Sequence, residues 1–336
     1  MHTNEIETIT PKHGISWKEA YQAGPGPSSL NEAAILALKG FCMGTADIIP
    51  GVSGGTIAFI MGIYDKLLEA IASFDMVFLK HIVRFNIKSA LTHAHLKFLL
   101  PMVIGIGTAL LSTAGLMHYL LHEYPEPTWS LFFGLIGASI VIVGKKITNW
   151  STGSLFLVLG AIGAYFLVGM IPRTTPETWW FVFLSGSIAI CAMILPGISG
   201  SFILLLMGKY LYITGALKNP VDVKNLLTLI IFACGALLGI IIFSRFLNYL
   251  LDNYRNATMA LLTGFMAGAM RKIWPWQHVE ALVSGNTTVN VTTNVLPRAF
   301  DRSFALDIGL IIFGLALVFL LEYYSRTPGR LAHEGE

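Results

Sequence analysis

The sequence predicts an all-α polytopic membrane protein made of two inverted-topology repeats, each a re-entrant helical hairpin plus three transmembrane helices. Hydrophobic residues make up 54% of the 336 residues and charged residues only 12%, about half the charged share of soluble domains. A broken apolar stretch occurs twice, and so does a second motif at the ends of spans. Because each half has an odd number of spans, the second half is expected to sit upside down relative to the first.

Composition also excludes several functions. The net charge of +3 is small and scattered, so no nucleic-acid partner is expected. The three cysteines, Cys42, Cys191 and Cys234, lie in apolar runs without metal-type or redox-type spacing. We therefore expect no metal site and no cofactor. Residues 1–31 are polar and lack the apolar core of a signal peptide, so the first membrane segment is predicted to direct insertion.

The first re-entrant hairpin is predicted at residues 32–64. Ser29 and Glu32 fit a capping box that opens an apolar helix. That helix is expected to stop at Pro50 and Gly51, because proline lacks an amide donor and glycine costs about 1 kcal/mol relative to alanine. The second limb, about 12 residues long, is too short to cross a membrane, which takes about 20 apolar residues. Irregular backbone at that depth must be buried in protein or line a wet cavity.

The remaining elements follow in order. A basic amphipathic segment, residues 65–96, is expected to lie at the cytoplasmic membrane surface. The first repeat, residues 32–171, is completed by predicted spans at 97–121, 129–144 and 154–171. The second repeat, residues 179–324, comprises a hairpin at 179–210, spans at 226–251, 257–271 and 304–324, and a polar loop at 274–303. A polar tail, residues 325–336, ends the chain.

Two pairs of similar segments define the duplication. IIPGVSGGTIAFIMGIY (48–64) resembles ILPGISGSFILLLMGKY (194–210) at a shift of 146 residues. HYLLHEYPEPTWSLFFG (118–134) resembles NYLLDNYRNATMALLTG (248–264) at a shift of 130. The two shifts differ by 16 residues, which indicates an insertion in the first copy, most simply the basic segment. Inverted repeats with broken helices that meet near the midplane are typical of secondary transporters.

The two breaks have the chemistry of a phosphate site. Ser53 and Ser199 each open a short helix and are predicted N-caps. A helix N-terminus carries about +0.5 of a charge and unpaired N–H groups, and glycine lets the backbone approach an anion closely. The predicted phosphate-binding residues are Ser53, Gly54, Gly55, Thr56, Ser199, Gly200, Ser201 and Arg245, and the predicted break residues are Pro50, Gly51, Pro196 and Gly197. The alternative is that the breaks only allow tight packing of the two hairpins.

Two ionisable residues are further candidates. Asp47 lies three residues before Pro50 and is a candidate site for proton or cation coupling, because acidic groups inside membranes are costly and usually functional. The alternative is that Asp47 caps or pairs within its hairpin, and its counterpart in the second repeat is Met193. Arg245 lies in a predicted span and could clamp phosphate through its guanidinium, or equally extend to the membrane interface.

The motifs GTADIIPGVSGGTIAFIMGIY and ILPGISGSFILLLMGKY resemble the bacterial and archaeal polyprenyl-phosphate transporter family (PopT-like), over about residues 32–325. The resemblance implies a flippase, not an enzyme, that returns undecaprenyl phosphate to the cytoplasmic leaflet for recycling in cell-envelope synthesis. It also implies two re-entrant hairpins. It carries over no catalytic residue. The expected partners are the polyprenyl phosphate lipid and the membrane, with an oligomer possible.

The distribution of Lys and Arg predicts the orientation, and two other functions remain as alternatives. With both termini cytoplasmic, 14 Lys and Arg residues lie inside and 8 outside, which favours that orientation in the inner (cytoplasmic) membrane. A small-anion or ion-coupled secondary transporter would use the same hairpins. A membrane lipid phosphatase is less favoured, because the sequence has no tight cluster of His with Arg and no repeated Asp pair at a membrane face.

Overall fold

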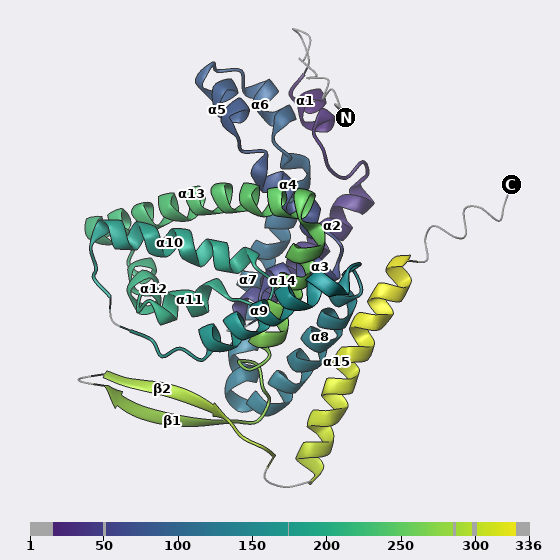
Figure 1. The fold of residues 1–336 in the computed structure, drawn as a ribbon. Coiled ribbons are helices and arrows are strands. Elements are labelled where there is room, and N and C mark those ends of the chain that lie inside the picture. The colour runs from purple at the N-terminus through teal and green to yellow at the C-terminus, as the bar shows by residue number, and fades with distance from the viewer. Residues whose placement is uncertain (1–15, 50–51, 174, 285–286, 298–300, 327–336) are drawn as a thin grey trace, which may run out of the picture.

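The computed structural model describes residues 16–49, 52–173, 175–284, 287–297 and 301–326 and is mainly helical (Figure 1). The helices are α1 Trp17–Ala23, α2 Leu30–Ile48, α3 Gly54–Ile60, α4 Tyr64–Ala72, α5 Met76–Val83, α6 Ile87–His93, α7 Leu96–Glu123, α8 Pro125–Gly144, α9 Trp150–Val168, α10 Trp179–Ile194, α11 Gly200–Leu206, α12 Tyr210–Lys218, α13 Val223–Asn253, α14 Arg255–Ala269 and α15 Arg302–Arg326. Two strands, β1 Gln277–Ser284 and β2 Thr287–Asn294, lie between α14 and α15.

Within the described residues, five helices are long and apolar enough to cross a membrane: α7, α8, α9, α13 and α15. The chain is therefore a multi-pass membrane protein. The predicted span at 257–271 corresponds to α14, which has only 15 residues. At 1.5 Å per residue α14 is about 22 Å long, short of a hydrocarbon core of about 30 Å. Most of its residues are buried in protein, so α14 belongs to the interior of the bundle.

Four helix pairs build the bundle: α2 packs on α7, α10 on α13, α9 on α14 and α8 on α15. Glycines let the backbones approach closely. A Cβ on Gly105 would lie 1.9 Å from the carbonyl oxygen of Ala37, and a Cβ on Gly235 would lie 2.0 Å from that of Phe183. Small residues at helix contacts are typical of membrane bundles. Gly105 and Gly235 occupy equivalent positions at the 130-residue shift, so α2–α7 and α10–α13 are equivalent contacts.

The two copies also share local structure at the second motif. The Thr128 hydroxyl donates to the carbonyl oxygens of Leu120 and Tyr124, at 3.2 and 2.6 Å. In the second copy, Thr258 donates to the equivalent carbonyls of Leu250 and Tyr254, at 3.1 and 3.0 Å. Each threonine thus ties the end of one long helix to the start of the next. The sequence repeat is matched by equal backbone geometry at these two turns.

The helix starts follow from local chemistry. The Ser29 hydroxyl accepts the Glu32 amide N–H at 3.2 Å and caps α2, as predicted. The Glu32 carboxylate accepts instead from the amide and hydroxyl of Ser28, at 2.8 and 3.0 Å. Only half of the predicted capping box therefore forms, and Ser28 replaces the backbone partner expected at Ser29.

The segment predicted as a polar loop, residues 274–303, contains an antiparallel β-hairpin, in which Gln277 pairs with Asn294 and Ser284 with Thr287. The Thr and Asn content of this segment predicts a loop. The Val and Thr residues of the same segment have high β-propensity, which explains the strands. The fold is therefore mainly rather than entirely α-helical. The β-hairpin lies at the end of the molecule away from α1, α5 and α6 (Figure 1).

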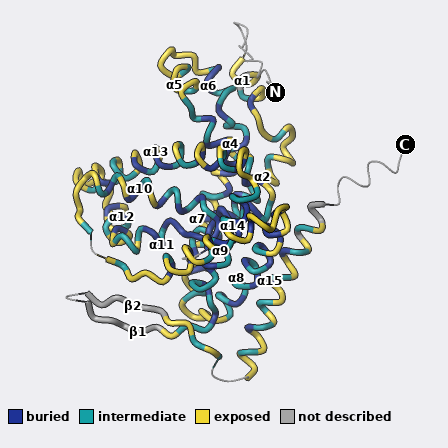
Figure 2. Tube along the Cα trace, viewed as in Figure 1, coloured by how far each residue is buried: buried dark blue, intermediate teal, exposed yellow. Residues whose placement is uncertain are grey.

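The basic amphipathic segment, residues 65–96, divides into a buried and an exposed part. In α4, Leu67, Leu68 and Ala70 are buried in the core, and α4 packs on α13. In α5 no described residue is buried. Figure 2 shows α5 as a mainly exposed projection, whereas the buried residues gather at the centre of the molecule. The segment is therefore exposed in α5 and partly buried in α4, and its placement at the cytoplasmic membrane surface stays a prediction.

Candidate functional site

The two polar breaks of the hairpins contact each other in the interior. The Ser53 hydroxyl lies 3.1 Å from the carbonyl oxygens of both Met193 and Leu195 and donates to them. The Thr56 hydroxyl accepts the amide N–H of Gly197 at 2.9 Å. These residues are about 140 positions apart in the chain. The hydrogen bonds therefore join the first break directly to the backbone of the second.

The contact between the breaks is buried. Ser53 and Thr56 are both 0% exposed. The Tyr64 hydroxyl adds a further bond, to the carbonyl oxygen of Ile194 at 3.2 Å. A Cβ on Gly55 would lie 2.3 Å from that same oxygen, so only glycine permits the approach. Two of the hydroxyls that the sequence assigns to phosphate, those of Ser53 and Thr56, bind the opposite hairpin in this conformation, as the packing alternative expects.

Asp47 hydrogen-bonds to the backbone at the first break. Its Oδ1 accepts the amide N–H of Gly54 at 2.7 Å, and the Ser53 hydroxyl accepts that of Gly55 at 3.1 Å. The Asp47 carboxylate thus lies at the N-terminus of α3, where the helix dipole favours negative charge. This geometry is the capping alternative for Asp47. Pro50 lies outside the described residues, as does Gly51.

The second break has a different arrangement. Gly197 has φ +87°, a backbone conformation that glycine adopts without strain, directly after Pro196. Ser199 occupies the N-cap position of α11, but its side chain makes no capping bond. Its hydroxyl lies 2.8 Å from that of Ser201 instead. Gly200 is buried and Ser201 half-buried. The predicted N-cap is therefore correct in position and wrong in its hydrogen bond.

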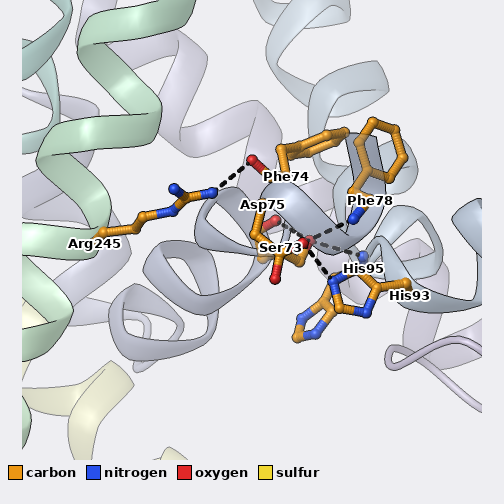
Figure 3. Close-up of polar contacts among 8 residues, drawn as sticks. Ser73, Phe74, Asp75, Phe78, His93, His95 and Arg245 are labelled. Atoms are coloured by element: carbon orange, nitrogen blue, oxygen red, sulfur yellow. Dashed lines mark hydrogen bonds and ion pairs between the residues drawn. The ribbon is translucent and has the colours of Figure 1, made fainter. Parts of the chain in front are cut away.

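Arg245 contacts the turn that contains Ser73, Phe74 and Asp75 (Figure 3). Its Nη2 donates to the carbonyl oxygen of Phe74 at 2.9 Å, at the turn between α4 and α5. Beside this turn, Asp75 Oδ1 accepts the Phe78 amide N–H at 2.8 Å and lies 2.9 Å from His93 Nε2. Partial burial raises the pKa of Asp75, but the Phe78 amide and His93 outweigh it and hold the pKa below its ordinary 3.8.

Two lysines that are not among the predicted site residues make structural contacts. Lys39 Nζ donates to the carbonyl oxygen of Met61, the C-cap of α3, at 3.0 Å. Lys209 is only 1% exposed, and its Nζ donates to the carbonyl oxygen of Thr175 at 2.8 Å. A lysine inside an apolar segment must find an acceptor or leave an uncompensated charge. That rule was the signal available in the sequence.

No group of three or more His, Cys, Asp and Glu residues in the described part of the chain has an arrangement that could hold a metal ion. The cysteines Cys42, Cys191 and Cys234 are all free thiols. The chemistry of the site is therefore that of hydroxyls, backbone groups and one carboxylate.

Comparison with known proteins places the chain. The model of a family described as undecaprenyl phosphate translocase-like matches residues 43–291. A protein of Vibrio cholerae named polyprenyl-phosphate transporter is 41% identical over 299 residues, covering 86% of this chain and 96% of its own length. A Staphylococcus aureus protein of the same name is 35% identical over 257 residues, covering 72% and 86%. No solved structure matches the chain. This chain belongs to the undecaprenyl phosphate translocase-like family.

Proposed function

We propose that this protein is a flippase that carries undecaprenyl or another polyprenyl phosphate across the cytoplasmic membrane, for recycling of the carrier lipid in cell-envelope synthesis. Two relatives are named polyprenyl-phosphate transporter, and the match extends over most of both chains. The observation that carries the proposal is the contact between the two polar breaks at Ser53 and Gly197, at the centre of a multi-pass bundle.

The repeated architecture supports an inverted arrangement of the two halves. The second limbs of the hairpins, α3 and α11, have seven residues each, or about 10 Å of helix, so neither can cross a bilayer. At the 130-residue shift α8 corresponds to α14, and the equivalent of α9 is α15. The contact of α9 with α14 therefore corresponds to that of α15 with α8. A twofold axis between the repeats would exchange α8 with α14 and α9 with α15, and so would produce these two equivalent contacts.

In this proposal the structure is a closed state of the carrier, and the phosphate passes when the breaks separate. Each hydrogen bond between the breaks contributes about 0.5–1.5 kcal/mol net. The bonds of Ser53, Thr56 and Tyr64 together then oppose separation by a few kcal/mol, a cost compatible with a sparsely populated open state. The phosphate would replace those partners, using the hydroxyls and the amides of Gly54, Gly55, Ser199, Gly200 and Ser201. The polyprenyl chain remains in lipid.

Coupling and orientation are further parts of the proposal. Protonation or cation binding at Asp47 would weaken its hydrogen bond to the Gly54 amide, and the backbone at the first break would then be held less firmly. The C-terminal end of α15 points toward the end of the molecule that carries α1, which supports placement of both on the same side of the membrane (Figure 1). Arg245 enters the proposal as an interfacial residue, because its guanidinium binds a turn between α4 and α5.

A small-anion or ion-coupled transporter is the second candidate, because two broken helices that meet in the interior fit that function equally well. Reconstitution in liposomes separates the two. A short-chain polyprenyl phosphate is placed in both leaflets, and the fraction open to an added phosphatase is followed over time. The proposal predicts that the protected lipid becomes accessible much faster than in protein-free liposomes. Uptake of inorganic phosphate without lipid movement would establish the second candidate instead.

A further inference from the structure

A cavity of about 420 Å³ lies between the start of α8, the base of the β-hairpin and the start of α15. Its volume is within the range of small-molecule sites. None of the described residues that line it is a lysine or an arginine. The lining combines three carboxylates and one imidazole with two aromatic rings, those of Glu126, Asp301, Asp307, His278, Trp276 and Phe304. Carboxylates together with aromatic faces suit a cation.

Asp307 contributes an unused acceptor to this cavity. It lies in the second turn of α15 and is only 1% exposed. Its Oδ2 accepts the indole N–H of Trp276 at 3.1 Å. Its Oδ1 is buried and has no hydrogen-bond partner among the described residues. The Ser130 hydroxyl of α8 interacts electrostatically with this carboxylate, but the two form no hydrogen bond. A buried carboxylate oxygen without a partner is costly, so a donor that enters the cavity would stabilise it.

The other repeat has an equivalent junction that protein groups close by themselves. Asn256, at the start of α14, accepts the amide N–H groups of Thr148 and Asn149 at 2.8 and 3.0 Å. Its Nδ2 donates to the carbonyl oxygen of Asn149 at 2.8 Å. Asn149 is also the N-cap of α9. One asparagine thus ties the start of α14 to the start of α9 without a ligand.

At the cavity, acidic residues stand in place of both asparagines. At the 130-residue shift Glu126 occupies the position of Asn256. Asp301 occupies that of Asn149, because its Oδ1 caps α15, the equivalent of α9, by accepting two amide N–H groups at 3.0 and 3.1 Å. Ionised carboxylates have no N–H to donate and repel each other. A cation between the two acids would supply the missing donors.

The arrangement favours an organic cation over a metal ion. No group of three or more His, Cys, Asp and Glu residues within the described ranges could hold a metal. An ammonium group donates up to three hydrogen bonds, and a cavity of this volume leaves room for its carbon skeleton. The rings of Trp276 and Phe304 have centroids 5.7 Å apart and offer aromatic faces to a cation.

We infer that this cavity binds a small organic ammonium ion, whose N–H groups bridge the carboxylates of Glu126, Asp301 and Asp307 and whose carbon skeleton lies against Trp276 and Phe304. The bound ion ties the start of α8 to the start of α15, as Asn256 does for α14 and α9. The inference does not rest on lipid transport. A free amine and the ethanolamine headgroup of a lipid present the same chemistry to the cavity.

Calorimetry on the purified protein in detergent tests the site. Putrescine is the probe, with butanediol as its neutral analogue and Mg²⁺ as a metal ion. Putrescine is expected to bind more tightly than either. Glu126→Asn with Asp301→Asn gives the cavity the residues of the closed junction and is expected to weaken putrescine binding by about tenfold or more, because charge-assisted hydrogen bonds are lost. Both residues are exposed, and asparagine also caps helices well, so this variant is expected to fold.

Glu123→Gln with Asp222→Asn is the matched control. It removes one exposed glutamate at a helix end and one exposed capping aspartate, both outside the cavity, and is expected to bind putrescine normally. Wild-type affinity in Glu126→Asn with Asp301→Asn would overturn the site. Equal affinity for butanediol would overturn the role of charge, and tighter binding of Mg²⁺ would overturn the choice of an organic cation.

A competition experiment identifies the source of the ammonium group. Putrescine is titrated into protein in micelles that contain phosphatidylethanolamine, and again in micelles that contain phosphatidylglycerol. Weaker apparent binding with phosphatidylethanolamine alone supports a lipid headgroup as the ligand. Equal binding in the two kinds of micelle overturns the headgroup and supports a free amine.

Discussion

At the scale of single residues, the two N-cap serines differ although their sequences match. Ser53 is fully buried and bonds to two carbonyls of the opposite hairpin and to the amide of Gly55. Ser199 bonds to Ser201 and caps nothing. In the proposed mechanism Ser53 holds the contact between the breaks together, and the Ser199 hydroxyl exchanges Ser201 for a new partner when that contact opens.

The serines are predicted to separate stability from transport. Ser53→Ala leaves buried carbonyl and amide groups without their partner, which costs about 1–3 kcal/mol. It should lower the Tm of the detergent-solubilised protein. Ser199→Ala is expected to leave Tm nearly unchanged but to slow lipid translocation in liposomes. Equal Tm values for the two variants would contradict the different roles, and wild-type transport in Ser199→Ala would remove Ser199 from the phosphate path.

Asp75 predicts a local dependence on pH. Its pKa is below the ordinary value of 3.8 in the folded protein, so the ionised carboxylate stabilises the turn before α5 above that value. This stabilisation is lost as the pH falls through the lowered pKa. Amide protection in α5, corrected for intrinsic exchange rates, should decrease over that acidic range in the wild type. In Asp75→Asn the protection should be lower near neutral pH and nearly independent of pH. The same acidic decrease in both proteins would show that another group is responsible.

At the scale of elements, close helix contacts determine the bundle, and glycine makes them possible. Gly105 brings α7 against the Ala37 carbonyl of α2. A Cβ added at Gly107, two residues later, would have no atom within 4 Å. These two positions in one helix form a matched pair. The helix propensity gained by alanine is the same at both, and only the contact differs.

Gly105→Ala is therefore predicted to destabilise the protein by about 1–3 kcal/mol, because its Cβ overlaps backbone that cannot move aside easily. Gly107→Ala should be neutral or raise stability by up to about 1 kcal/mol. Denaturant or thermal unfolding in the same detergent measures both. A Gly105→Ala protein as stable as Gly107→Ala would mean that α2 and α7 are not packed as described.

Much of the element pattern was predictable, because strong local signals produce it. Long apolar runs gave the spans, and the Pro-Gly breaks gave the limits of α2 and α10. The helix α14 was predicted as a full span, because its apolar composition does not distinguish a helix buried in the bundle from one that crosses the membrane. The sequence identifies the polar residues at the two breaks, but it does not predict which hydrogen bonds they form. That Ser53 bonds to Leu195 depends on packing between hairpins about 140 residues apart, which no local pattern encodes.

At the scale of the whole molecule, the central claim is that the contact between the two breaks must open for the lipid phosphate to cross. The bonds of Ser53 and Thr56 join the two halves of the chain at the centre of the bundle. Equivalent contacts on either side, α2 with α7 and α10 with α13, leave each hairpin attached to its own long helix. The pairs α9–α14 and α8–α15 join helices of different repeats, so the units that move in the proposed opening are α2 with α7 and α10 with α13 rather than whole repeats.

A reversible covalent lock tests this claim most directly. Ser53→Cys and Leu195→Cys put one cysteine in each break, where the Ser53 hydroxyl lies 3.1 Å from the Leu195 carbonyl oxygen, in a chain with Cys42, Cys191 and Cys234 replaced by alanine. Formation of the cross-link is verified before transport is measured. Translocation of a short-chain polyprenyl phosphate is measured in one liposome preparation after oxidation and again after reduction, with each single cysteine as control. Oxidation is expected to stop lipid movement in the double variant alone, and reduction is expected to restore it. Undiminished translocation by the fully cross-linked protein would contradict the central claim.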